Sequence, residues 1–303
     1  MENFTIDSHI TIVKIDSEND GKDTIDNPKQ KETYINANIV NLTPDTPIYR
    51  IFKIERLLST LKEKKLCLVK PKLWDDPFEN FLFNASGVLD DGSIVSFKPI
   101  REQFYGQCWS MKEECDGLWR NYTSNSCKTC TKSDFNKRKG HSPISAKVKT
   151  TVGKLMDAFY DKTNPLHYSC YFIGKVRYCK IDEIVNYLKN AKANICDTSN
   201  INQVLSLLIK RESFSYEEEV RLIFSMPSPE SQFDINKIKN PWDYNSDVFN
   251  FSINPNQLFD EIELNPWIDN QECASIINEI KKYYAGNVVK SKLYNHPFFK
   301  IKL

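Results

Sequence analysis

Residues 217–224 read Glu-Glu-Glu-Val-Arg-Leu-Ile-Phe, and this run constrains the fold more than any other part of the chain. Side chains alternate between the two faces of a β-strand. A strand here would have one apolar face, made of Val220, Leu222 and Phe224. Its other face would present Glu217, Glu219 and Arg221, with Ile223 beyond them. The run predicts either a rigid support for a reacting group or a solvated face held together by Glu–Arg pairing.

Composition sets the broad class. The chain has 303 residues, of which 40% are hydrophobic and 27% charged, values typical of a globular protein of one or two domains. The formal net charge of +1 excludes a global field that attracts nucleic acid or membranes. Basic residues gather between Lys137 and Lys154. This composition favours a solvated face, and it indicates a nucleic-acid contact less strongly.

Cysteine usage and hydropathy predict the compartment. The first 15 residues lack the apolar core of a signal peptide, and no apolar run approaches the length of a membrane span. Nine cysteines without a regular spacing fit a reducing cytoplasm. Cys127 and Cys130 form one C-x-x-C, but no second pair follows at zinc-ribbon spacing, so we expect free thiols and no metal site.

The organisation along the chain predicts residues 1–45 as an arm and residues 46–303 as a single α+β domain. Its sheet is expected to be mostly antiparallel, in one piece or split, and flanked by helices. Apolar spacing predicts a helix that buries Ile54, Leu57 and Leu61. Further helices are expected near residues 117–122, 146–160, 182–192, 199–211 and 269–286, and strands near 48–52, 66–69, 104–110, 168–178, 247–253 and 259–264.

Four segments in order resemble the bacterial domain-of-unknown-function family 2971. They are Tyr49-Arg50 before a Leu-rich helix, Trp74-Asp75-Asp76-Pro77-Phe78-Glu79, Trp119-Arg120-Asn121-Tyr122, and Tyr216-Glu217-Glu218-Glu219-Val220-Arg221. The resemblance spans about residues 47–265. The family itself names no reaction.

The same order of elements also resembles ADP-ribosyltransferases of the arginine–serine–glutamate type. On this resemblance, Arg50, Ser110 and Glu219 take the three named positions, and Glu217 is the companion acid. The resemblance implies an ADP-ribosyltransferase-like fold and an enzyme that uses NAD as its substrate. It also implies a role as a toxin or phage-defence effector.

The implied chemistry needs residues of these types. Cleavage of the nicotinamide–ribose bond builds positive charge on the ribose, which a carboxylate such as Glu219 stabilises. Glu217 would orient or deprotonate the incoming nucleophile. The remaining candidates would contact NAD: Arg50 at the phosphates, Ser110 at the ribose, Tyr49 or Trp109 at the nicotinamide, and Arg221 beside the acids.

Each of these residues also has a purely structural interpretation. Ser110 could cap the next segment, Trp109 could belong to the core, and Glu79 could be an anchor paired with Arg120 or Arg221. Two other functions therefore remain open. One is a non-catalytic interaction module, and the other is a magnesium nuclease built on Asp75, Asp76, Glu79 and the strand carboxylates. The acceptor of the ADP-ribose, protein or nucleic acid, cannot be named from the sequence.

Overall fold

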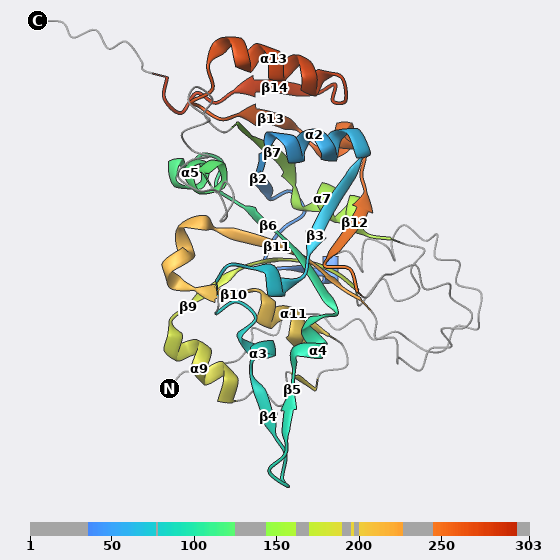
Figure 1. Ribbon diagram of the computed structural model, residues 1–303, viewed down its shortest axis with the longest axis vertical. Helices are drawn as coiled ribbons and strands as arrows, with labels where there is room; N and C mark the ends of the chain where they lie inside the picture. The colour runs from blue at the N-terminus through green and yellow to red at the C-terminus, as the bar shows by residue number, and fades with distance from the viewer. Residues whose placement is uncertain are drawn as a thin grey trace, which may run out of the picture. The chain divides into compact units, whose positions relative to one another are not determined.

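The computed structural model (Figure 1) describes residues 36–76, 78–124, 144–161, 170–189, 195–196, 200–226 and 245–295. These residues form two compact units, each assembled from segments far apart in the sequence. The first unit comprises residues up to Thr46, Cys67–Trp109 and Val152–Phe251. The second comprises Pro47–Leu66, Ser110–Thr151 and Ser252–Leu303. Of the predicted arm, only residues 36–45 are described, so its boundary with the domain stays a prediction.

The first unit is built on strands β8 (Tyr171–Lys175) and β11 (Glu219–Ser225), which pair antiparallel, with β6 (Phe104–Ser110) on the other side of β11. β1 (Ile39–Val40) joins β8 in parallel. Two smaller pairs are β9 (Arg177–Cys179) with β10 (Ile209–Arg211), parallel, and β4 (Ser86–Val88) with β5 (Ile94–Ser96), antiparallel. The helices of the unit are η1 (Pro71–Leu73), α3 (Phe81–Asn84), α4 (Lys98–Arg101), α7 (Val152–Phe159), α9 (Ile181–Lys189), α11 (Ile201–Leu207) and η2 (Glu212–Glu217).

The core of the first unit explains why β11 is central. All seven β11 residues are buried, including those on the polar face. Phe104 of β6, Phe172 of β8 and Ile223 of β11 belong to one apolar cluster together with residues of α3, α9 and α11. A strand buried on both faces must pair any charged side chain that it carries, because an isolated buried charge is costly.

The second unit is built on β2 (Pro47–Lys53), which pairs antiparallel with β7 (Ser145–Thr151) over seven residues. β13 (Glu261–Leu264) pairs antiparallel with β7 and parallel with β14 (Asn287–Lys290). Its helices are α2 (Ile54–Glu63), α5 (Asp116–Ser124), α12 (Pro255–Leu258) and α13 (Asn270–Lys281), and α13 lies along β14 in Figure 1. β3 (Lys65–Val69) and β12 (Val248–Ser252) contain residues of both units.

Several sequence predictions are confirmed. Antiparallel pairings outnumber parallel ones among the described strands, as expected for an α+β protein. α2 buries Ile54, Leu57 and Leu61 and ends where Lys64 adopts a left-handed conformation (φ 54°). The N-cap Asp269 accepts hydrogen bonds from two backbone N–H groups of α13. Apart from these predictions, no helix in the described part of the chain is both long and apolar enough to cross a membrane.

Two predicted helices are partly wrong. The helix expected over residues 146–160 begins only at Val152, because Ser145–Thr151 forms β7. The helix expected over 199–211 ends at Leu207, and its last three residues form β10 instead. The second correction matters for function, because β10 carries Lys210.

Candidate functional site: a buried charge cluster in the first unit

β11 places Glu219 and Arg221 on one face, two residues apart, as the alternation predicts. Glu217 is not on this strand, and that part of the prediction is wrong. It ends the 3₁₀ helix η2, and Glu218 follows in a left-handed conformation (φ 42°) before β11 begins. The turn nevertheless directs the Glu217 carboxylate toward the same centre as Glu219, because both bind one lysine.

That lysine is Lys210 of β10. Its Nζ lies 2.7 Å from Glu217 Oε2, 3.0 Å from Glu219 Oε2 and 3.1 Å from Glu79 Oε1. The ammonium group therefore bridges three carboxylates, of which one comes from residue 79 and two come from the stretch 217–219. We call Glu79, Lys210, Glu217, Glu219 and Arg221 the buried charge cluster, since none of these residues is more than 9% exposed.

Arg221 occupies the interior of the cluster and is fully buried. Its Nε donates to Glu219 Oε1 at 2.9 Å, and one terminal nitrogen donates to Glu79 Oε1 at 2.8 Å. The other terminal nitrogen donates to the Leu207 carbonyl at 2.6 Å. The prediction that Glu79 anchors Arg221 is confirmed. Its alternative partner Arg120 instead bonds Asp116.

The segment from Trp74 to Glu79 supports the cluster from one side. The Arg221 guanidinium carbon lies 4.3 Å from the Trp74 ring centroid, and Asp76 accepts two hydrogen bonds from Arg211. A Cβ on Gly106 of β6 would come within 2.5 Å of the Trp74 ring, so only glycine leaves room for the indole there. These contacts give the Trp-Asp-Asp-Pro-Phe-Glu segment a structural role beside the acids.

The two acids of the predicted site differ in protonation behaviour. Burial alone would raise the pKa of Glu219, but Arg221, Lys210 and the Cys108 thiol outweigh it and hold that pKa at about 2. For Glu217, burial dominates, and the neighbouring carboxylates Glu219 and Glu79 add to it, so its pKa is raised in spite of Lys210. Glu219 is therefore ionised at neutral pH, whereas Glu217 is the acid closer to proton exchange.

Trp109, a predicted NAD contact of the first unit, is 2% exposed, and its indole N–H donates to Gln107 at 2.8 Å. These contacts favour its interpretation as a core residue. Of the other four predicted NAD contacts, Arg221 belongs to the first unit, and Tyr49, Arg50 and Ser110 belong to the second. Ser110 accepts a hydrogen bond from the Lys112 backbone N–H, which is the capping role weighed from the sequence, and half-buried Arg50 lies over the Phe52 ring.

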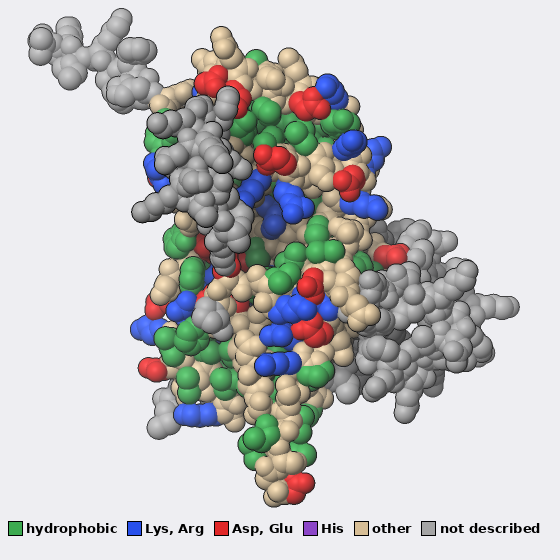
Figure 2. Space-filling model, viewed as in Figure 1, with side chains coloured by type: hydrophobic (Ala, Val, Ile, Leu, Met, Phe, Trp, Pro, Cys, Tyr) green, Lys and Arg blue, Asp and Glu red, His purple; other side chains and the backbone are tan. Residues whose placement is uncertain are grey.

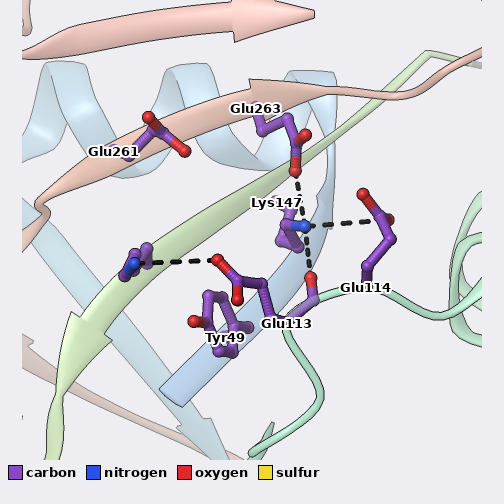
Figure 3. A pocket seen from close by; sticks show the side chains of 7 residues that line it. Tyr49, Glu113, Glu114, Lys147, Glu261 and Glu263 are labelled. Carbon is purple, nitrogen blue, oxygen red and sulfur yellow. Dashed lines mark hydrogen bonds and ion pairs between the residues drawn. The ribbon is translucent and has the colours of Figure 1, made fainter. Parts of the chain in front are cut away.

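The third of these residues, Tyr49, lines a cavity of about 250 Å³ in the second unit (Figure 3). The other lining residues are Glu113, Glu114, Lys147, Lys149, Glu261 and Glu263. The ammonium groups of Lys147 and Lys149 lie 5.6 Å and 5.7 Å from the Tyr49 ring centroid. Four carboxylates outnumber two ammonium groups, so this cavity repels the phosphates of a dinucleotide.

Acidic residues that the nuclease alternative assigns to a metal ion have other partners in the structure. No group of three or more His, Cys, Asp or Glu residues there is arranged to hold a metal ion. Asp76 forms an ion pair with Arg211, and Glu79 forms ion pairs with Lys210 and Arg221, so these two acids of the nuclease alternative already have cationic partners. Cys127, Cys130 and all four histidines lie outside the described residues.

Comparison with known proteins gives only distant likenesses. The chain matches no protein-family model and no curated protein. DarT from Thermus sp. 2.9 in complex with NAD+ is similar at 10% identity and a TM-score of 0.36, over 83% of this chain and 98% of that one. DarT in complex with ADP-ribosylated ssDNA is similar at 11% identity and a TM-score of 0.35, over 82% and 96%. Such values do not establish a shared fold, and the resemblance to family 2971 stays a prediction.

The sequence interpretation missed three contributors to the cluster: Lys210, Cys108 and Tyr178. Lys210 follows the apolar residues Leu207, Leu208 and Ile209 and precedes Arg211, and cations at the end of such a run are a signal that buried partners exist. Tyr178 accepts a hydrogen bond from the Glu219 backbone N–H at 2.8 Å. Neither Cys108 nor Tyr178 carries a local sequence signal for this role.

Proposed function

We propose that the chain is an NAD-dependent ADP-ribosyltransferase whose catalytic carboxylates are Glu219 and Glu217. The observation that carries the proposal is a pair of neighbouring carboxylates, Glu217 and Glu219, which lie 2.7 Å and 3.0 Å from one Lys210 ammonium group and whose pKa values shift in opposite directions. Enzymes commonly hold two neighbouring carboxyl groups at different pKa values, so that one stabilises charge and the other transfers a proton. NAD is proposed as the substrate because Arg50, Ser110 and Glu219 resemble the arginine–serine–glutamate positions of such enzymes.

The proposed reaction breaks the bond between C1′ of the ribose and the nicotinamide nitrogen. The bonding electron pair leaves with nicotinamide, and positive charge develops on the ribose, where the ionised Glu219 stabilises it. The acceptor oxygen or nitrogen then forms the new bond to C1′ and passes its proton to Glu217. Arg221 and Lys210 hold both acids in place through the contacts described above.

The other NAD contacts are proposed from residue type. The planar guanidinium of Arg50 suits the phosphates, the hydroxyl of Ser110 suits a ribose oxygen, and the ring of Tyr49 suits the nicotinamide. Arg221 is fully buried and bonded within the cluster, so we propose that it positions Glu219 and does not touch NAD. A cellular role as a toxin or phage-defence effector is the corresponding biological hypothesis.

A test of the reaction uses the purified protein, a cell lysate, and NAD labelled either in its adenylate part or in its nicotinamide. Adenylate label that enters one of the protein, RNA or DNA fractions, with nicotinamide label released free, would support the proposal and identify the acceptor class. A folded protein that neither binds NAD nor releases nicotinamide would contradict it. Activity on nucleic acid that needs no NAD and stops with a chelator would favour the nuclease instead.

The decrease of kcat/KM at low pH should result from protonation of Glu217. Because its folded-state pKa is raised, the proton acceptor forms only at a pH above the ordinary carboxyl value of about 4.3. We expect kcat/KM of the wild type to fall as pH drops through that raised value, and Glu217→Gln to be slower and to lack this decrease. Initial rates of nicotinamide release across pH measure both. A decrease that persists in the variant would assign it to another group.

The second candidate, a non-catalytic interaction module, is favoured by one feature of the first unit. The β4–β5 hairpin exposes apolar side chains along its length and carries acidic residues at its tip (Figure 2). Val88 and Ile94, which face each other across the hairpin, are 73% and 75% exposed. Exposed apolar surface of this kind is typical of a contact with another macromolecule.

A further inference from the structure

The Tyr178 hydroxyl lies at the edge of the buried charge cluster. β9 and β10 pair in parallel with Tyr178 in register with Lys210, so the two side chains project to the same face. The hydroxyl oxygen accepts the Glu219 backbone N–H at 2.8 Å. Tyr178 is half-buried, and Glu217 is the most exposed member of the cluster, with 12% of its side chain accessible. This edge is the part of the cluster that a ligand can reach most easily.

The hydrogen of that hydroxyl is available for a ligand. A tyrosine hydroxyl has one donor and can also accept. The acceptor function is used by Glu219, and among the described residues the hydrogen has no acceptor. Burial, together with the Glu219 and Glu217 carboxylates, raises the pKa of Tyr178, although the Glu219 N–H acts in the opposite direction. The side chain therefore keeps its proton, and so its donor, throughout the pH range in which the protein works.

The chemistry of this edge selects the kind of group that binds there. Tyr178 offers a hydrogen-bond donor, and Glu217 offers a carboxylate acceptor on the same side, because it binds Lys210, the residue in register with Tyr178. A phosphate would meet the three carboxylates of the cluster, and an ammonium group could not accept from Tyr178. A neutral hydroxyl group both accepts and donates, and it satisfies both residues at once.

We infer that Tyr178 is a further ligand-contacting residue that binds, together with Glu217, one hydroxyl group of the nicotinamide ribose. This inference rests on the proposed NAD-dependent function. The hydroxyl would accept the Tyr178 O–H and donate to the Glu217 carboxylate. Tyr178 would then fix the sugar beside Glu219 through the same oxygen that orders the Glu219 backbone.

The test is a double-mutant cycle between the protein hydroxyl and the ligand hydroxyls. The variants are Tyr178→Phe and, as a matched control, Tyr187→Phe, whose hydroxyl bonds the Asn202 carbonyl in the same unit. The substrates are NAD and its analogues lacking the 2′- or the 3′-hydroxyl of the nicotinamide ribose. The measured quantity is kcat/KM for nicotinamide release, and intrinsic differences in substrate reactivity cancel within the cycle.

With NAD, Tyr178→Phe is expected to lower kcat/KM roughly 3- to 10-fold, the usual effect of one hydrogen bond. With the analogue that lacks the contacted hydroxyl, the same substitution should lower kcat/KM less than with NAD, because only the contact with the Glu219 N–H is then lost. Tyr187→Phe should change kcat/KM by the same factor for all three substrates. An equal loss on all substrates would show that Tyr178 acts only by ordering Glu219, and the inference would fail. A wild type that releases no nicotinamide would refute the proposed function and this inference together.

Discussion

Glu219→Gln is expected to reduce ADP-ribose transfer about 100- to 1,000-fold, the effect of removing one electrostatic contact to the transition state. The arrangement of the cluster is the reason. Arg221 and Lys210 hold the pKa of Glu219 at about 2, so the wild-type side chain carries a full negative charge at neutral pH. The amide of glutamine keeps the shape of the side chain but carries no charge with which to stabilise a cationic ribose. Label transfer and nicotinamide release measure the loss.

Folding must be separated from chemistry in this experiment. The structure buries Glu219 against two cations, so Glu219→Gln should also lower the free energy of unfolding, by about 1–3 kcal/mol. Glu79→Gln is the matched control, because Glu79 is equally buried and binds the same Lys210 and Arg221. Both variants should lose stability, and only Glu219→Gln should lose most of its activity. Equal losses of activity in the two variants would show that Glu219 does not take part directly in the reaction.

The sequence predicts the parts of the site that depend on local periodicity. The alternation of apolar and charged residues in 219–224 correctly pairs Glu219 with Arg221 on one face of a strand, because the period of two holds wherever the backbone is extended. The same logic fails at Glu217, since the left-handed residue Glu218 interrupts the strand. Nothing in three consecutive glutamates indicates which one leaves the extended conformation.

The rest of the cluster depends on tertiary pairing. Lys210 lies in a three-residue strand that follows a helix directly, and the apolar residues before it match a helical pattern equally well. Its function as a bridge arises only when β10 pairs with β9 and when η2 and β11 bring their carboxylates to it. The contact between Trp74 and Gly106 joins residues 32 positions apart and leaves no local signal.

A second consequence of the cluster concerns stability and holds whether or not the protein is an enzyme. Arg221→Met is expected to lower the free energy of unfolding by about 3–5 kcal/mol, the usual cost of leaving a buried charge without its partner. Methionine replaces much of the apolar stem, but Glu219, Glu79 and the Leu207 carbonyl all lose a donor. Urea unfolding followed by circular dichroism measures the change. Arg177→Met is the control, because its pair with Glu183 is 4.0 Å long and half exposed, and such pairs contribute about 0–1 kcal/mol.

The pH dependence of this loss identifies its cause. In the wild type the pKa of Glu219 is depressed, so its contribution of about 3 kcal/mol is present above the unfolded value near 4.3 and is lost as pH falls toward about 2. Without Arg221, only Lys210 and the Cys108 thiol oppose the effect of burial, so the pKa of Glu219 should rise and protonation should remove the poorly compensated charge as pH falls. The difference in stability between wild type and Arg221→Met should therefore shrink from about pH 7 to about pH 3. A difference that stays constant would mean that the variant loses packing around the guanidinium and not charge pairing.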